Sequence, residues 1–131
     1  MTFMMSKILV VDDERSIAET MRDIFQSAGY AAHCAYSGDE AITKAANLCP
    51  DVLLSDVMMP GMNGFEVALQ VKQICPECRL LLFSGQIATS LVAQGFVQTF
   101  TENGYHYELL SKPLHPSELI ERVRQVLLRP E

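Results

Sequence analysis

Short apolar runs alternate along the chain with longer stretches whose apolar residues recur at helical spacing. Three such runs, Lys7 to Asp12, Asp51 to Asp56 and Arg79 to Ser84, are largely aliphatic. Weaker apolar segments span Tyr30 to Tyr36 and about His106 to Ser111. Continuous apolar runs of this length are typical of strands buried on both faces, and the Tyr30 to Tyr36 segment predicts an edge strand.

The stretches between and after these runs predict five helices. The expected segments are Ile17 to Ala28, stopped by Gly29; a helix toward Leu48, opened by the capping-box pattern Ser37-Gly38-Asp39-Glu40; Asn63-Gly64 to about Cys75; about Thr89 to Thr101; and a last helix with Leu119, Val123, Val126 and Leu127 on its inner face. Five strands in alternation with five helices predict an α/β fold, in which helices cover both faces of a doubly wound, five-stranded parallel sheet.

The composition is that of one globular domain over residues 1–131, and its net charge disfavours some kinds of binding partner. Hydrophobic residues make up 49% and charged residues 20%, and the formal net charge is −6. An acidic surface disfavours direct binding of nucleic acid or anionic lipid. The longest aliphatic runs, Ile8 to Val11 and Leu80 to Phe83, fall far short of the roughly 20 residues of a membrane span. The N-terminus shows no signal pattern, so we expect a cytoplasmic protein without membrane insertion.

A cytoplasmic location predicts that the four cysteines, Cys34, Cys49, Cys75 and Cys78, are reduced thiols. Cys75-Pro76-Glu77-Cys78 matches the Cys-x-x-Cys pattern of redox and zinc sites. It lies at the C-terminal end of a predicted helix, however, where the helix dipole disfavours a thiolate. A zinc site would need two further ligands, and the sequence offers no second pair. A redox or metal role for this motif is therefore the less favoured alternative.

Unusual polar residues follow the predicted strands where each one ends. Asp12 and Asp13 follow the first strand, Asp56 and Ser84 end two others, and Lys112 follows the last. The carboxyl ends of parallel strands meet at one edge of the sheet, where such folds bind ligands. Converging carboxylates repel one another and need a hard cation or an ammonium group for compensation. A carboxylate nucleophile with Mg²⁺, an ammonium and a hydroxyl is the set that phosphoryl transfer to an aspartate requires.

Four motifs stand in order at these strand ends. They are Val10-Val11-Asp12-Asp13-Glu14, Asp56-Val57-Met58-Met59-Pro60-Gly61-Met62-Asn63-Gly64, Ser84-Gly85 and Lys112-Pro113-Leu114. Together they resemble the receiver (CheY-like) domain of two-component response regulators, from Lys7 to about Leu128. The resemblance implies a flavodoxin-like sheet with strand order 2-1-3-4-5 and a core of about 7–128. It also implies a role in phosphorelay signal transduction.

The resemblance implies a role for each matching residue. Asp56 would be the phosphoacceptor, supplied by a sensor histidine kinase or a histidine phosphotransfer protein. Asp13, Asp56 and the backbone carbonyl of Met58 would hold Mg²⁺ (or Mn²⁺) directly, and Asp12 would hold it largely through water. Lys112 would bind one phosphoryl oxygen.

Two further roles concern the geometry around the phosphoryl group. Ser84 would swing to hydrogen-bond another phosphoryl oxygen. A cis peptide bond before Pro113 would aim the ammonium of Lys112 into the site, and proline is the residue that makes a cis bond inexpensive.

The sequence departs from the family pattern on the side that signals to partners. The interval from Ser84 to Lys112 is longer than usual by roughly one to two helical turns. Receivers usually carry an inward-turning Tyr or Phe three residues before the lysine. Leu109 stands there in this chain, with Tyr107 two residues earlier. We expect the fourth helix, the last strand and the last helix to contact a downstream protein. The segment from Ile87 to Tyr105 would move and bind that partner, and its Phe96 and Phe100 would lie either on the binding face or in the core.

Two other functions stay open. A pseudo-receiver would keep the fold and bind partners without phosphate, although the complete acid set with Lys112 argues against it. A haloacid dehalogenase-type phosphohydrolase needs a second Asp two positions after the nucleophile, and this chain has Met58 there. We therefore expect a phosphoacceptor and not an enzyme, its own slow autodephosphorylation aside. The chain stops soon after the last helix, and the sequence leaves open whether it is a stand-alone receiver or part of a longer regulator.

Overall fold

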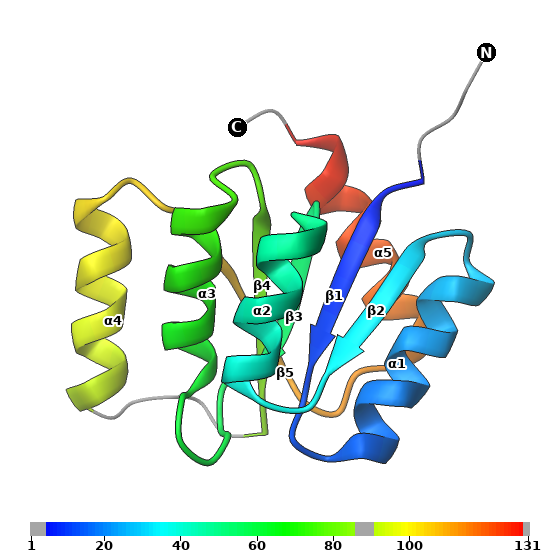
Figure 1. Ribbon diagram of the computed structural model, residues 1–131, viewed down its shortest axis with the longest axis horizontal. Coiled ribbons are helices and arrows are strands. Elements are labelled where there is room, and N and C mark those ends of the chain that lie inside the picture. The colour runs from blue at the N-terminus through cyan, green and yellow to red at the C-terminus, as the bar shows by residue number, and fades with distance from the viewer. Residues whose placement is uncertain (1–4, 86–90, 130–131) are drawn as a thin grey trace.

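A computed structural model describes residues 5–85 and 91–129, and in it five strands form one parallel sheet with the order β2-β1-β3-β4-β5 (Figure 1). The strands are β1 (Lys7–Val11), β2 (Ala31–Ala35), β3 (Val52–Asp56), β4 (Arg79–Ser84) and β5 (Glu108–Ser111). The helices are α1 (Arg15–Ser27), α2 (Gly38–Leu48), α3 (Gly64–Ile74), α4 (Leu91–Glu102) and α5 (Pro116–Leu128). The predicted α/β fold class and strand order are confirmed.

The helix ends follow from local chemistry in the sequence. The Ser37 hydroxyl accepts a hydrogen bond from the backbone N–H of Glu40 at the start of α2, as the capping-box pattern predicts. Asn63 caps α3 in the same way. Gly29, after α1, has a φ of +97°, a conformation that favours glycine. The α4 helix starts two residues later than expected, and residues 86–90 before it lie outside the described residues.

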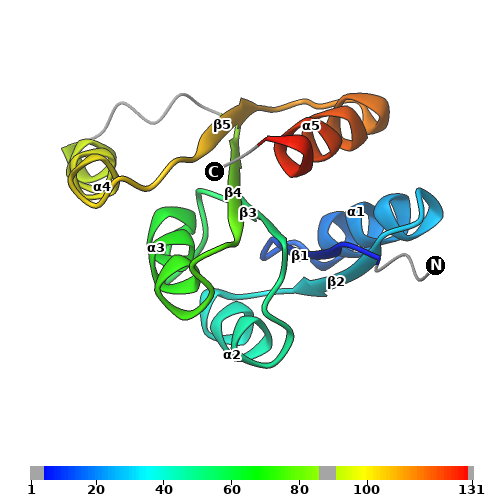
Figure 2. The ribbon, with the colours of Figure 1, turned by 90° about the horizontal axis from the view of Figure 1, so that it is seen from above.

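The sheet separates two hydrophobic cores because successive strand side chains point to opposite faces. Seen from above, α2 and α3 lie on one face and α1 and α5 on the other (Figure 2). The first core contains Leu9, Val11, Leu53, Leu80 and Leu82 with Ala41, Phe65 and Phe100. The second contains Ile8, Val10, Val52, Leu54, Leu81 and Phe83 with Ala18, Phe25, Leu119 and Val123. The strands are apolar on both sides because helices cover both faces of the sheet.

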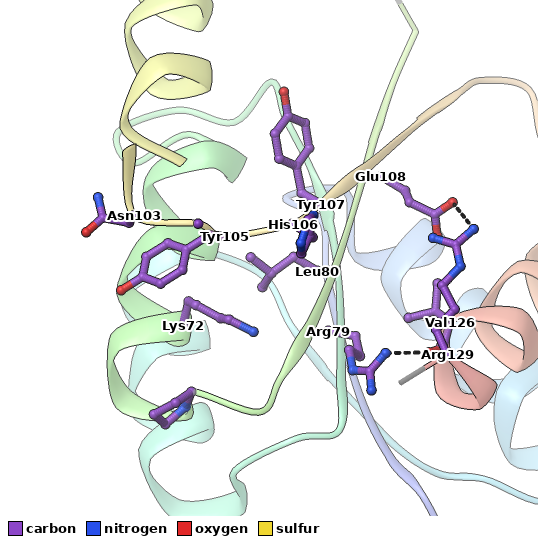
Figure 3. Close-up of a pocket in the computed structure, with 12 residues that line it drawn as sticks. Lys72, Arg79, Leu80, Asn103, Tyr105, His106, Tyr107, Glu108, Val126 and Arg129 are labelled. Atoms are coloured by element: carbon purple, nitrogen blue, oxygen red, sulfur yellow. Dashed lines mark hydrogen bonds and ion pairs between the residues drawn. The ribbon is translucent and has the colours of Figure 1, made fainter. Parts of the chain in front are cut away.

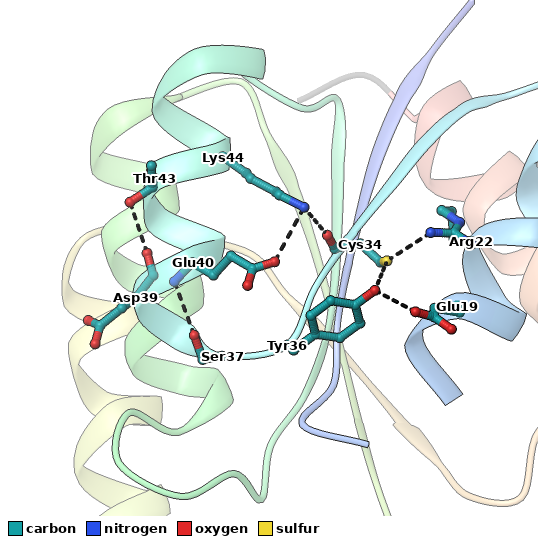
Figure 4. Close-up of polar contacts among 9 residues, drawn as sticks. All are labelled: Glu19, Arg22, Cys34, Tyr36, Ser37, Asp39, Glu40, Thr43 and Lys44. Atoms are coloured by element: carbon teal, nitrogen blue, oxygen red, sulfur yellow. Dashed lines mark hydrogen bonds and ion pairs between the residues drawn. The ribbon is translucent and has the colours of Figure 1, made fainter. Parts of the chain in front are cut away.

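A polar cluster ties the edge strand β2 to the helices beside it (Figure 4). The Tyr36 hydroxyl donates to Glu19 of α1 at 2.7 Å, and this bond raises the pKa of the phenol. The Arg22 guanidinium, also from α1, lies 3.5 Å from the sulfur of Cys34. From α2, the Lys44 ammonium donates to the backbone carbonyl of Cys34. The strand is therefore held from both faces of the sheet.

The prediction of four reduced thiols is wrong for two of them. Cys49 and Cys75 form a disulfide with their Cα atoms 5.6 Å apart, whereas Cys34 and Cys78 take no part in a disulfide. The physical reason is the packing of α2 beside α3. Both helices run against the strands and end at the same edge of the sheet, so their C-cap residues, Cys49 and Cys75, meet there (Figure 1). Cys75 pairs with a residue 26 positions away and not with Cys78 of its own motif.

Candidate functional site

Three carboxylates meet at the carboxyl edge of the sheet, as the strand ends predict. Asp12 follows β1 and Asp56 ends β3, and the pairing of Val11 with Ser55 sets them at the same level. One carboxylate oxygen from each of Asp12, Asp13 and Asp56 lies within 4.8 Å of the others. Asp12 and Asp56 are 1% and 6% exposed, while Asp13 is open to solvent. The cluster therefore has a buried floor and an exposed rim.

Backbone groups fix the two buried carboxylates in place. The N–H of Glu14 donates to Asp12 Oδ1 at 2.9 Å, and the N–H of Met58 donates to Asp56 Oδ1 at 3.2 Å. At Gly64, the first residue of α3, an added Cβ would collide with the backbone carbonyl of Asp56. Only glycine lets α3 begin this close to the end of β3, so this residue sets where the loop that follows Asp56 returns to the sheet.

Lys112 supplies the positive charge beside the cluster. Its Nζ lies 3.2 Å from Asp56 Oδ2 and 3.8 Å from Asp12 Oδ2, and it stands 4.8 Å from the centre of the Phe83 ring. The peptide bond between Lys112 and Pro113 is cis, as the resemblance implies. One ammonium group therefore contacts both buried carboxylates from the end of β5.

Ser84 ends β4 at the same edge and is buried. In the sheet register, Asp56 pairs with Phe83, so Ser84 lies one position beyond the partner of Asp56. Its backbone carbonyl accepts a hydrogen bond from the N–H of Lys112 at 2.9 Å. The structure thus brings Asp12, Asp13, Asp56, Ser84 and Lys112 to one edge of the sheet.

The surroundings of Asp12 act on its carboxylate in opposing directions. Burial raises the pKa of Asp12, and the neighbouring Asp56 and Asp13 act in the same direction. The hydrogen bond from Glu14 and the charge of Lys112 oppose this rise. Among the residues that the structure describes, none donates a hydrogen bond to Asp12 Oδ2, which is a buried carboxylate oxygen. Such an oxygen, beside two further carboxylates, fits a hard cation with oxygen ligands.

The comparisons with known proteins agree with this geometry. The family model for the response regulator receiver domain matches residues 8–124. The chain belongs to the response regulator receiver domain family. It is 34% identical over 131 residues to the DNA-binding response regulator MtrA of Mycolicibacterium smegmatis, covering 100% of this chain and 54% of that protein. It is 32% identical over 123 residues to the response regulator MprA of Mycobacterium avium, covering 94% and 51%. This receiver domain thus spans about half the length of the curated relatives it matches.

Solved structures show the same fold. The chemotaxis protein CheY4 of Vibrio cholerae superposes with a TM-score of 0.78 at 33% identity, covering 94% of this chain and 99% of that one. A CheY-like receiver domain protein from Methanospirillum hungatei superposes with a TM-score of 0.81 at 25% identity, covering 95% and 94%. Receiver domains are signal transducers rather than enzymes, and their acidic pocket binds Mg²⁺. None of the described helices of this receiver combines the length and apolarity that crossing a bilayer requires.

The positions expected to signal to partners are divided between surface and core. Leu109 of β5 is 42% exposed, whereas Tyr107, just before β5, is half-buried. The centre of the Tyr107 ring lies 5.1 Å from the centre of the Phe100 ring and 5.9 Å from that of the Phe65 ring. Phe100 is fully buried in the core, so the core alternative holds for this residue and it does not form part of an exposed partner-binding face. Phe96 is half-buried against the same core and stacks on Phe65 at 5.8 Å.

A cavity lined by residues of α3, β4, α5 and the connection from α4 to β5 is shown in Figure 3, and none of the aspartates of the cluster lines it. It measures about 610 Å³ and lies between the end of α3, the connection from α4 to β5, and the end of α5. Lys72, Arg79 and Arg129 line it together with Tyr105 and Tyr107. Sequence reasoning missed this cavity because it depends on how the long α4–β5 connection folds over the start of β4. The carboxylates of the candidate site take no part in it.

Proposed function

We propose that this receiver domain accepts a phosphoryl group on Asp56 and passes the signal to a protein partner. The observation that supports this most directly is the contact of one ammonium, that of Lys112, with two buried carboxylates at the end of the sheet. In the transfer, a carboxylate oxygen of Asp56 attacks the phosphorus of a phosphohistidine on the donor. The new O–P bond forms as the P–N bond breaks, and the donor imidazole leaves.

The other residues neutralise and orient the transferred group. Asp12, Asp13 and Asp56, with the backbone carbonyl of Met58, would hold Mg²⁺ or Mn²⁺. The bound metal ion neutralises charge on the phosphoryl oxygens. Lys112 exchanges its ion pair with Asp56 for one with a phosphoryl oxygen, because phosphorylation removes one carboxylate charge and adds phosphoryl charge at the same place. Ser84 hydrogen-bonds a further phosphoryl oxygen.

The partners follow from the family and from the charge of the chain. A sensor histidine kinase or a histidine phosphotransfer protein would supply the phosphoryl group in the cytoplasm. A downstream protein would bind the surface of α4, β5 and α5, where Leu109 is exposed, and the switch would involve the buried Ser84 and the half-buried Tyr107. With a net charge of −6, the domain itself is not expected to bind nucleic acid. One domain over residues 1–131, with its core at about 7–128, carries this function.

The test is phosphorylation by acetyl phosphate with Mg²⁺, read as intact mass. Wild-type protein should gain one phosphoryl mass, and Asp56→Asn should gain none because the nucleophilic oxygen is replaced by an amide. The matched control is Asp51→Asn, which changes an exposed aspartate just before the same strand. Asp51 Oδ2 accepts a hydrogen bond from the N–H of Lys7, an acceptor that asparagine preserves. This variant should be phosphorylated like the wild type.

Three outcomes would contradict the assignment. Undiminished phosphorylation of Asp56→Asn would place the acceptor elsewhere. Phosphorylation that survives a metal chelator would remove the metal from the reaction. A wild type that gains no phosphoryl mass from acetyl phosphate or from any histidine-phosphorylated donor, while it still binds a protein partner, would favour the pseudo-receiver alternative.

A further inference from the structure

The Cys49–Cys75 bridge joins two helix ends that differ sharply in exposure. Cys49 follows α2 in a left-handed conformation with a φ of 45°, and it is exposed to solvent. Cys75 follows α3 and is 3% exposed, within the core between the two helices. Cys34 and Cys78 are likewise buried, at 4% and 1%. Of the four cysteines, Cys49 is thus the one that a reagent in solution can reach.

The surroundings of Cys75 suit a thiol as well as a disulfide. Its sulfur lies 3.5 Å from the backbone carbonyl oxygen of Ala45, which also accepts the N–H of Cys49 at 2.8 Å. When the bridge is reduced, the Cys75 thiol has this carbonyl as a hydrogen-bond acceptor. The N–H of Cys78 donates to the carbonyl of Cys75 at 2.9 Å and fixes the turn that follows α3. The buried Cys75 thiol would therefore have a hydrogen-bond acceptor within reach once the bridge opens.

We propose that Cys49 and Cys75 are a reversible thiol–disulfide exchange site, in which small thiols and disulfides react at Cys49 and Cys75 is the resolving cysteine. On oxidation, the Cys49 thiolate attacks a low-molecular-weight disulfide RSSR, forms a mixed disulfide and releases RS⁻. Cys75 then loses its proton to solvent and attacks the Cys49 sulfur, which releases a second RS⁻. Two electrons pass from the protein sulfurs to RSSR, and both RS⁻ ions take up protons to give 2 RSH. Reduction follows the same path in reverse, with attack at Cys49.

The site lies apart from the aspartate cluster, although one covalent ring contains both Asp56 and the bridge. The chain from Cys49 to Cys75 includes β3, the loop after Asp56 and all of α3. An eleven-residue helix separates the two ends of α3 by about 15 Å. We therefore expect the redox state to control how firmly the C-terminal turns of α2 and α3 are held together. Phosphoryl uptake at Asp56 should change less than twofold between the oxidised and reduced protein.

The experiment uses glutathione as the small thiol and disulfide. Full-length protein is equilibrated in buffers with different ratios of reduced to oxidised glutathione, quenched with acid, alkylated and mapped by peptide mass. Oxidising buffers should protect Cys49 and Cys75 together, and reducing buffers should expose both again. In Cys75→Ser the intermediate cannot resolve, so one glutathionyl group should accumulate on Cys49. In Cys49→Ser, mixed-disulfide formation at Cys75 should be at least tenfold slower.

A matched control variant and a second measurement distinguish an effect on thiol–disulfide exchange from a general effect on folding. Cys34→Ser changes a buried free cysteine in the other core, and it should leave the glutathione dependence unchanged. Hydrogen exchange in residues 38–49 and 64–75 should slow at least several-fold on oxidation of wild-type protein and stay unchanged in Cys49→Ser. The proposal is overturned by equal labelling of Cys75 in Cys49→Ser, by a Cys75–Cys78 bridge in place of Cys49–Cys75, or by four alkylatable thiols after oxidation.

Discussion

At the carboxyl edge of the sheet, three carboxylates lie within 4.8 Å of one another, and Lys112 contacts the two buried ones. At the amino edge, a disulfide joins α2 to α3 above the same strands. The first arrangement gathers like charges at a cost in stability, because two carboxylates about 5 Å apart repel by around 3 kcal/mol at an effective dielectric near 20. The second adds stability by restricting the unfolded chain. This domain thus holds its converging carboxylates and its covalent bridge at opposite ends of the same elements.

Removing the bridge should give the largest change in stability. A ring closed over 26 positions corresponds to about 3.5 kcal/mol in the chain-entropy view of disulfides. Cys49→Ser should therefore unfold more easily than oxidised wild type by about that amount in urea titrations. Serine keeps a side chain at the left-handed position, so the backbone cost at this site is retained. Reduced wild type should match the variant, and a difference of less than 1 kcal/mol from oxidised protein would show that the bridge contributes little.

Relieving charge at the carboxyl edge should act in the opposite direction and more weakly. Asp13→Asn removes an exposed carboxylate beside two buried ones. In the presence of a chelator, the free energy of unfolding of this variant should therefore exceed that of wild type by about 1 kcal/mol, and its melting temperature should be higher. Mg²⁺ should stabilise wild-type protein by ligand binding and should stabilise this variant much less. Equal stabilisation of both proteins by Mg²⁺ would place the metal ion outside the cluster.

The smallest expected effect is the interaction free energy between substitutions at the two edges of the sheet, and it tests whether the edges are independent. Substitutions more than about 10 Å apart, with no shared partners, usually add within 0.5 kcal/mol. The double variant Cys49→Ser with Asp13→Asn should therefore show the sum of the two single changes within that range. A larger interaction free energy, measured in the same urea titrations, would mean that α3 transmits strain from one edge of the sheet to the other.

The sequence supports prediction of the carboxyl edge because its residues stand at strand ends. Parallel strands bring their carboxyl ends together whatever the details of packing, so Asp12, Asp56 and Lys112 could be placed side by side from their positions alone. The alternation of apolar runs and helical spacing was likewise enough for the fold, and the pattern of Ser37 and Glu40 was enough for the cap of α2.

The disulfide at the amino edge could not be predicted in this way, because it depends on where two helices end in space. Cys49 and Cys75 are separated by 26 positions, and their meeting requires α2 and α3 to lie side by side and to finish at one level. The Cys-x-x-Cys spacing of Cys75 and Cys78 gives no sign that Cys49 is the partner of Cys75. The place of Phe100 stayed open for a related reason, since helical spacing shows which residues share a face but not whether that face meets the core.

The ring closed by the bridge also changes what a cut in the backbone does. The loop between Asp56 and α3 carries Met58, which is 70% exposed, and Gly61 with its positive φ. Exposed loop tips of this kind are preferred sites for proteases. When the bridge is closed, a single cleavage there leaves both pieces joined through Cys49 and Cys75. A nicked domain thus stays one covalent molecule, and only reduction lets its two halves part.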